Sequence, residues 1–210
     1  MTKYGKLTTA LIAVWFVLAL TASGLHLILT SPNEPPLPLG LAAAAPLVLF
    51  LVWFIASPGF RHFTMTLNPR VLTWVQSWRI AGFVFLVLAT YGILPKLFAL
   101  PAGWGDMTIG ATAVFVGLKL ASPDHRKSFI AWQLLGMGDL IMAVMLGTLA
   151  GVIDPHGVAN KAMTVLPLSM IPTFAVPLLM IFHIICIAQA AQWPVRGYSA
   201  IAEPLPSHSA

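Results

Sequence analysis

The stretch FIAWQLLGMGDLIMAVMLGTLAGVI, residues 129–153, is a long apolar run in which Asp139 is the single charged side chain. A helix needs about 20 mostly apolar residues to cross the hydrocarbon core of a bilayer, so this run predicts a membrane-spanning helix. A charged group at that depth costs about 2.5–3.5 kcal/mol on insertion scales and is usually paired or functional. Asp139 therefore marks both the fold class and the place to look for chemistry.

The composition of the whole chain agrees with a membrane protein. Hydrophobic residues make up 59% of the 210 residues and charged residues only 8%, whereas ordinary soluble domains carry about 25% charged residues. The net charge of +5 does not indicate nucleic-acid binding, because the basic residues are scattered over the predicted loops. The single cysteine, Cys186, excludes a disulfide or a thiolate metal cluster within one chain.

Six segments are long and apolar enough to span a bilayer, which predicts an all-α integral membrane protein built as a six-helix bundle. The predicted helices are 7–30, 38–57, 70–94, 105–121, 129–153 and 163–191. Together they form one transmembrane domain over residues 1–192. Residues 193–210 are rich in Pro and Ser and are predicted to be a flexible cytoplasmic tail.

The basic residues of the loops predict the orientation. If the N-terminus is cytoplasmic, seven basic residues flank the helices on that side: Lys3, Lys6, Arg61, Arg70, Arg126, Lys127 and Arg196. The outer loops then carry only Lys96 and Lys161. This excess of positive charge inside favours a topology with both termini in the cytoplasm, and we expect a bacterial inner (plasma) membrane.

Three ionisable side chains are expected at one depth. Asp139, Arg79 and His183 lie ten, nine and eight residues from the predicted cytoplasmic ends of their helices, or about 12–15 Å at 1.5 Å per residue. Helical spacing also puts each on a stripe of potential contact residues. The three stripes are Trp132, Gly136, Asp139 and Ala143; Gln76, Arg79, Gly82 and Phe83; and Leu179, His183, Cys186 and Ala190.

We therefore predict a buried network of Arg79, Asp139 and His183, and a glycine beside the aspartate would let a neighbouring helix approach closely. The supporting residues are expected to be Gln76, Gln133, Gln189 and Cys186. Two interpretations stay open. Asp139 and His183 could exchange a proton while Arg79 keeps the carboxylate ionised, or the three residues could simply hold three helices together.

The start of the sixth helix is interrupted by prolines at five-residue spacing, namely Pro167, Pro172 and Pro177. Each proline removes a backbone N–H and frees a carbonyl four residues earlier, so a kinked helix is predicted. Irregular backbone inside a bilayer is tolerated where protein or a water-filled cavity covers it. The hydroxyls of Thr164, Ser169 and Thr173 make this region a candidate wall of an outward-facing cavity, although a kink repaired by neighbouring helices is the plainer alternative.

A second polar group is expected on the outer side, where Asp106 would cap the start of the fourth helix after the sequence PAGWG. Asp106 with His26, Asp154 and His156 is a weak candidate set for a divalent metal, because imidazole and carboxylate suit zinc, iron or manganese. The small-residue face Asp106, Gly110, Ala113 and Gly117 predicts close contact with another helix.

These features favour a small membrane transporter or channel-like protein with a buried polar network, coupled to protons, for an ion or small molecule that the sequence does not identify. The first alternative is a redox protein that binds haem b through His183 alone, or a quinone. The second is a non-catalytic subunit that docks onto a membrane complex or another copy of itself. The sequence has no G-x-S-x-G or H-E-x-x-H motif, so a hydrolytic enzyme is not expected.

Overall fold

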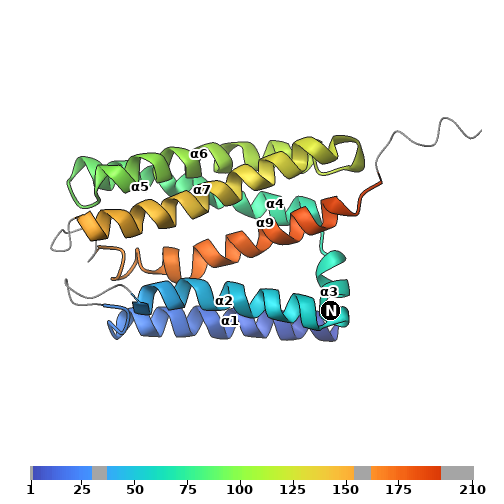
Figure 1. Ribbon diagram of the computed structural model, residues 1–210, viewed down its shortest axis with the longest axis horizontal. Coiled ribbons are helices and arrows are strands. Elements are labelled where there is room, and N and C mark those ends of the chain that lie inside the picture. Colours follow the sequence, from blue (N-terminus) through green and yellow to red (C-terminus); the bar gives the residue numbers. More distant parts are fainter. Residues whose placement is uncertain (1, 30–36, 154–161, 195–210) are drawn as a thin grey trace, which may run out of the picture.

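The computed structural model describes residues 2–29, 37–153 and 162–194, and every regular element within these ranges is a helix (Figure 1). In chain order the elements are α1 (Lys3–Gly24), α2 (Leu37–Ala56), α3 (Pro58–Met65), α4 (Pro69–Val75), η1 (Gln76–Gly82), α5 (Phe83–Thr90), α6 (Lys96–Lys119), η2 (Pro123–His125), α7 (Arg126–Ile153), η3 (Ile171–Ala175) and α9 (Val176–Ala191).

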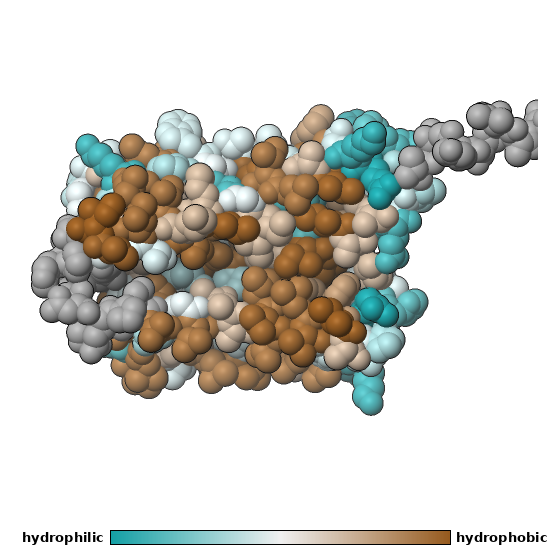
Figure 2. Space-filling view, in the orientation of Figure 1, coloured by the Kyte–Doolittle hydropathy of each residue, from teal (hydrophilic) through white to brown (hydrophobic). Residues whose placement is uncertain are grey.

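Five helical stretches are long and apolar enough to cross a membrane: Lys3–Gly24, Leu37–Ala56, Pro69–Thr90, Pro123–Ile153 and Ile171–Ala191. The prediction of an all-helical membrane protein is therefore confirmed. Helix α6 has 24 residues but is not one of the five; it contains four glycines and Asp106, which make it less apolar. Much of the face of the bundle seen in Figure 2 is apolar, as expected for a surface in contact with lipid.

Helix α9 lies in the middle of the bundle (Figure 1). It packs against α2 on one side and against α4 and α7 on the other, while α6 packs against both α7 and the α4–η1–α5 rod. The first turn of α1 and the last turn of α9 lie at the same end of the molecule.

The fourth predicted helix, 105–121, begins earlier than expected, at Lys96, and contains Pro101. A proline inside a helix removes one backbone hydrogen bond and normally marks a boundary. Here the extra turns are buried, because Phe98, Ala99 and Ala102 pack with Phe85 of α5 in one apolar cluster. Burial of this face compensates the lost hydrogen bond, and the helix continues through the proline.

The sixth predicted helix, 163–191, is regular only in its second half. Residues 163–169 form turns, Ile171–Ala175 is a π-helix and α9 starts at Val176, so the proline spacing correctly indicated an interruption.

The first helix also differs from its predicted range of 7–30, since α1 ends at Gly24 and His26 has a positive φ of 57°. In the predicted loop 57–70, Ser57 caps the short helix α3 by accepting a hydrogen bond from the Phe60 amide.

Candidate functional site

The middle of the third membrane span is a 3-10 helix, η1, and it directs Arg79 into the bundle. A 3-10 helix has three residues per turn, so side chains three apart lie on one face. Gln76, Arg79 and Gly82 are accordingly all buried. Phe83, which an α-helical spacing put on the same face, is instead half exposed, because the shorter turn rotates it away.

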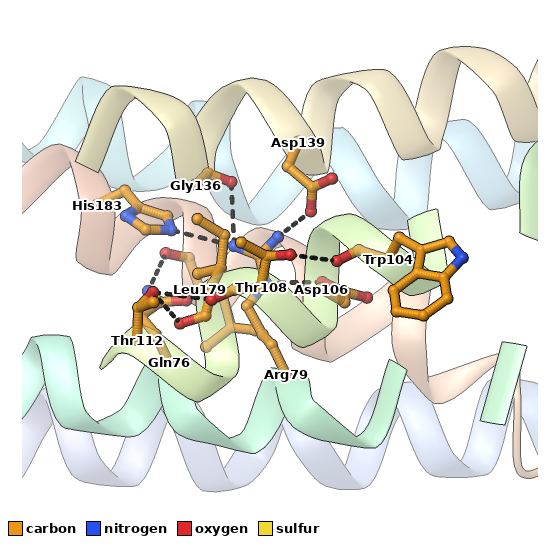
Figure 3. A network of polar contacts seen from close by, with 11 residues as sticks. Gln76, Arg79, Trp104, Asp106, Thr108, Thr112, Gly136, Asp139, Leu179 and His183 are labelled. Atoms are coloured by element: carbon orange, nitrogen blue, oxygen red, sulfur yellow. Dashed lines mark hydrogen bonds and ion pairs between the residues drawn. The ribbon is translucent and has the colours of Figure 1, made fainter. Parts of the chain in front are cut away.

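The guanidinium of Arg79 binds two carboxylates that come from two different helices (Figure 3). Its Nε donates to Oδ1 of Asp106 on α6, with an N–O distance of 2.6 Å. Its Nη2 donates to Oδ2 of Asp139 on α7. Charge-assisted hydrogen bonds of this kind are stronger than neutral ones, and the side chain of Arg79 is only 2% exposed.

The other amino group of Arg79 faces α7 and α9. Nη1 donates to the carbonyl oxygen of Gly136 at 3.0 Å and contacts Nε2 of His183 at 3.3 Å. The second ring nitrogen of His183, Nδ1, lies 2.5 Å from Oε1 of Gln133. Because the arginine can only donate and the amide oxygen can only accept, these contacts fit a neutral imidazole that carries its proton on Nδ1. We call Arg79, Asp106, Asp139, His183 and Gln133 the polar centre.

The structure thus brings together the three residues that the sequence singled out, with Arg79 between the other two. Asp139 and His183 each contact Arg79, and a direct proton transfer between them is not the arrangement seen. Gln133 extends the chain of hydrogen bonds, since its Nε2 donates to Oγ1 of Thr73 at 3.0 Å. The network therefore joins α4, η1, α6, α7 and α9.

Asp106 is the residue whose role was predicted wrongly. It does not cap the outer end of a helix, because α6 begins at Lys96 and carries Asp106 near its middle. A repeated motif in the sequence could have predicted the buried position of Asp106. GWGD at 103–106 and GMGD at 136–139 share the pattern G-x-G-D. The aspartates of the two copies bind the same guanidinium.

Glycines make room for the polar centre. A Cβ on Gly105 would collide with the carboxylate of Asp139, and one on Gly82 would collide with Asp106. A Cβ on Gly110 would collide with the backbone at Ile80, which confirms the close helix contact predicted for the small-residue face of α6. Gly136 gives space to His183, whereas a Cβ on Gly138 would have nothing within 4 Å.

The charges of the polar centre do not balance when both acids are ionised. One guanidinium faces two carboxylates, and the imidazole is neutral, so the group carries one net negative charge. It is neutral when one carboxyl holds a proton. In addition, Oδ1 of Asp139 is buried and accepts no hydrogen bond from any described residue. Buried polar atoms are rarely left without a partner, so this oxygen is available to a proton or a ligand.

The supporting residues lie in three different places. Gln76 donates to the carbonyl of Leu179 at 3.1 Å and so ties η1 to α9. Gln189 contacts the α3–α4 connection, where its Nε2 donates to the carbonyl of Leu67 at 2.8 Å. The thiol of Cys186 is buried 3.9 Å from the Thr73 hydroxyl. Gln189 and Cys186 therefore stabilise packing outside the polar centre.

The residues proposed to line an outer cavity surround the interrupted part of the sixth span. The hydroxyl side chains of Thr164, Ser169 and Thr173 are all buried, so protein covers them in this structure and an open cavity there stays a prediction. Pro177 lacks the N–H that would bind the carbonyl of Thr173. That carbonyl accepts instead from the indole N–H of Trp15 at 3.1 Å, which joins α1 to the break.

Of the weak metal candidates, the structure describes His26 and Asp106, and these two lie in different parts of the fold. His26 lies beyond the end of α1 and Asp106 binds Arg79, while Asp154 and His156 fall outside the described residues. Within residues 2–29, 37–153 and 162–194, no three His, Cys, Asp or Glu side chains are grouped so that they could hold a metal ion.

The family described as Domain of unknown function (DUF8737) matches residues 36–191. The chain belongs to this family. The DUF8737 region contains the whole polar centre, from Arg79 to His183, whereas α1 precedes it. No curated protein and no solved structure matches the chain.

Proposed function

We propose that this DUF8737 protein is a small membrane transporter whose polar centre takes up and releases a proton. The observation that carries the proposal is that Arg79 is bound by two aspartates rather than one. An arginine and a single aspartate would be enough to hold two helices together. The second carboxylate adds a charge that must be neutralised inside the bilayer, and a proton is the simplest neutralising group.

The depth of the centre supports this function. Arg79 lies ten residues from Pro69 and eleven from Thr90, the two ends of its span. Asp106 and Asp139 are also near the middle of α6 and α7. Ionisable groups at the middle of a membrane are characteristic of ion and proton pathways.

We propose six crossings, with α6 as the additional one and both termini in the cytoplasm. The N-terminal end of α1 and the C-terminal end of α9 lie at one end of the bundle, and Figure 2 shows hydrophilic surface gathered there. The basic residues Lys3, Lys6, Arg61, Arg126 and Lys127 belong to segments at this end. An excess of Lys and Arg marks the cytoplasmic side of a membrane protein.

The haem alternative receives less support from the geometry. An axial ligand must offer a free ring nitrogen to the iron. Both nitrogens of His183 are already in contact with side chains, Nε2 with Arg79 and Nδ1 with Gln133. Haem ligation would have to break one of these contacts inside the bundle.

The proposal is tested by proton uptake into vesicles that contain the purified protein and a pH-sensitive dye, driven by a potassium diffusion potential. Wild-type protein should transport protons faster than protein-free vesicles do. Asp106→Asn and Asp139→Asn should slow the flux at least about tenfold, the effect of about 1.4 kcal/mol on a barrier. Asp124→Asn, in η2 at the end of the bundle, is the matched control and should behave as wild type.

Two results would contradict the proposal. The first is wild-type vesicles that take up protons no faster than protein-free vesicles. The second is a pair of folded Asp106→Asn and Asp139→Asn variants with wild-type flux and lowered thermal stability, which would leave the polar centre as a purely structural contact.

A further inference from the structure

The polar centre approaches the surface on one side of the bundle, between α6 and α7. The side chains of Asp106 and Asp139 are 15% and 9% exposed, whereas that of Arg79 is 2% exposed. Leu135, one turn from Asp139 on α7, is 67% exposed, and Trp104, two residues before Asp106 on α6, is 62% exposed. These apolar residues face lipid, so the carboxylates are nearest to the bilayer and not to either aqueous end.

Two glycines lie next to Asp139 where α6 and α7 meet, and we call this contact the seam. Gly138 is exposed, and a Cβ added there would meet nothing within 4 Å. Gly105 lies on the facing helix directly against the carboxylate of Asp139. Gly105 therefore leaves only backbone against Asp139 on the facing helix, and Gly138 adds no side chain beside the acid on α7.

The two carboxylates can offer a ligand only acceptor atoms. Arg79 has five N–H groups, and four are directed at Asp106, Asp139, Gly136 and His183. Only one N–H is left over, and the excess negative charge of the two carboxylates repels an anion. Oδ1 of Asp139, in contrast, is buried and receives no hydrogen bond from the described part of the chain. A positively charged group fits both this free oxygen and the single excess negative charge.

We propose that the polar centre binds a lipophilic organic cation with one positive charge, which enters from the bilayer between α6 and α7 and competes with one proton for the carboxylate pair. The inference rests on the proposed function and adds the substrate class. When the cation binds, the protonated aspartate releases its proton to water, and the total charge of the centre and its occupant stays at zero. Cation and proton thus compete for the same carboxylate pair.

Binding of tetraphenylphosphonium to the protein in lipid nanodiscs tests this directly, with empty nanodiscs as the background. Tetraphenylborate, an anion of the same shape, is the matched control ligand. We expect saturable binding of the cation alone, with one proton released per cation. In the acidic range, where the centre is protonated, affinity should fall about tenfold per pH unit, as linkage requires for competition with one proton. Asp139→Asn should weaken the binding at least tenfold.

A pair of glycine variants tests the route of entry. Gly138→Phe would place a large ring on the exposed surface of α7 next to Asp139, and Gly40→Phe places the same ring on α2, where a Cβ also meets nothing within 4 Å. Gly138→Phe should weaken cation binding at least tenfold, while Gly40→Phe should leave it unchanged. Equal affinities of the two variants would overturn entry between α6 and α7.

Other outcomes overturn the cation site itself: no saturable binding, equal binding of the anion, or affinity that does not change with pH. These results are distinguishable from failure of the proposed function. If vesicles still take up protons through Asp106 and Asp139 but the cation does not bind, only the substrate class is wrong. If proton uptake is also absent, both proposals fall.

Discussion

The ring of His183 occupies the place that a side chain at residue 136 would take. A Cβ on Gly136 would lie 2.5 Å from Cε1 and 2.7 Å from Nε2 of His183, and 3.4 Å from Nη1 of Arg79. The absence of a side chain on α7 at this position therefore allows the imidazole of α9 and the guanidinium of η1 to meet. One glycine determines how closely three membrane spans approach each other.

Gly136→Ala should consequently destabilise the protein, whereas Gly138→Ala should not. Overpacking a buried contact usually costs about 1–3 kcal/mol, and the atoms near Gly136 belong to a ring and a guanidinium held by hydrogen bonds. Gly138 has open space around it, and alanine favours a helix over glycine. Thermal unfolding of the two variants in detergent, followed by circular dichroism, checks this. Equal losses for both would contradict the close contact.

Gln133 and His183 should be energetically coupled. Their side chains are both 0% exposed and joined by the Nδ1–Oε1 contact of 2.5 Å. Removing either partner alone leaves a buried polar atom unsatisfied, which costs about 1–3 kcal/mol. In a double-mutant cycle with Gln133→Met and His183→Phe, the double variant should lose less stability than the sum of the single variants, by about 0.5–3 kcal/mol. Strict additivity would show that the contact contributes nothing.

Trp15→Phe should lower stability by about 0.5–1.5 kcal/mol, the usual net value of one hydrogen bond. The variant removes the indole N–H that binds the carbonyl of Thr173. It retains an aromatic ring next to Phe174, whose centroid lies 4.8 Å from that of Trp15. Trp78→Phe is the control, because Trp78 is on the lipid-facing surface and should tolerate the change. A wild-type melting temperature for Trp15→Phe would show that α1 does not stabilise the break before α9.

The sequence predicted the depth of the buried residues because a helix rises by a constant amount per residue. Arg79, Asp139 and His183 were found at one level by counting from the predicted cytoplasmic helix ends, and errors of up to three residues at those ends did not matter. The faces of α7 and α9 followed from the same regularity, since Gly136, Cys186 and Ala190 are buried as expected.

What could not be predicted depends on contacts between helices. Pro101 and the glycines around Trp104 are typical of a loop, and only packing of Phe98 and Ala102 makes that segment helical. With the helix start misplaced, Asp106 was assigned to the outer surface. The 3-10 geometry at Gln76–Gly82 was not predicted either, and it lies at a tertiary contact, the close approach of Gly110 to the backbone of Ile80.

The central claim is that the pair Asp106 and Asp139 holds one exchangeable proton beside Arg79. Infrared difference spectra of the reconstituted protein between mildly alkaline and acidic pH measure this directly, because a protonated carboxyl has a C=O stretch that a carboxylate lacks. The account predicts one carboxyl band that appears on acidification, is lost or shifted in Asp139→Asn and Asp106→Asn, and is unchanged in Asp124→Asn. A wild-type spectrum without such a band, or one that both variants retain unaltered, would contradict the account.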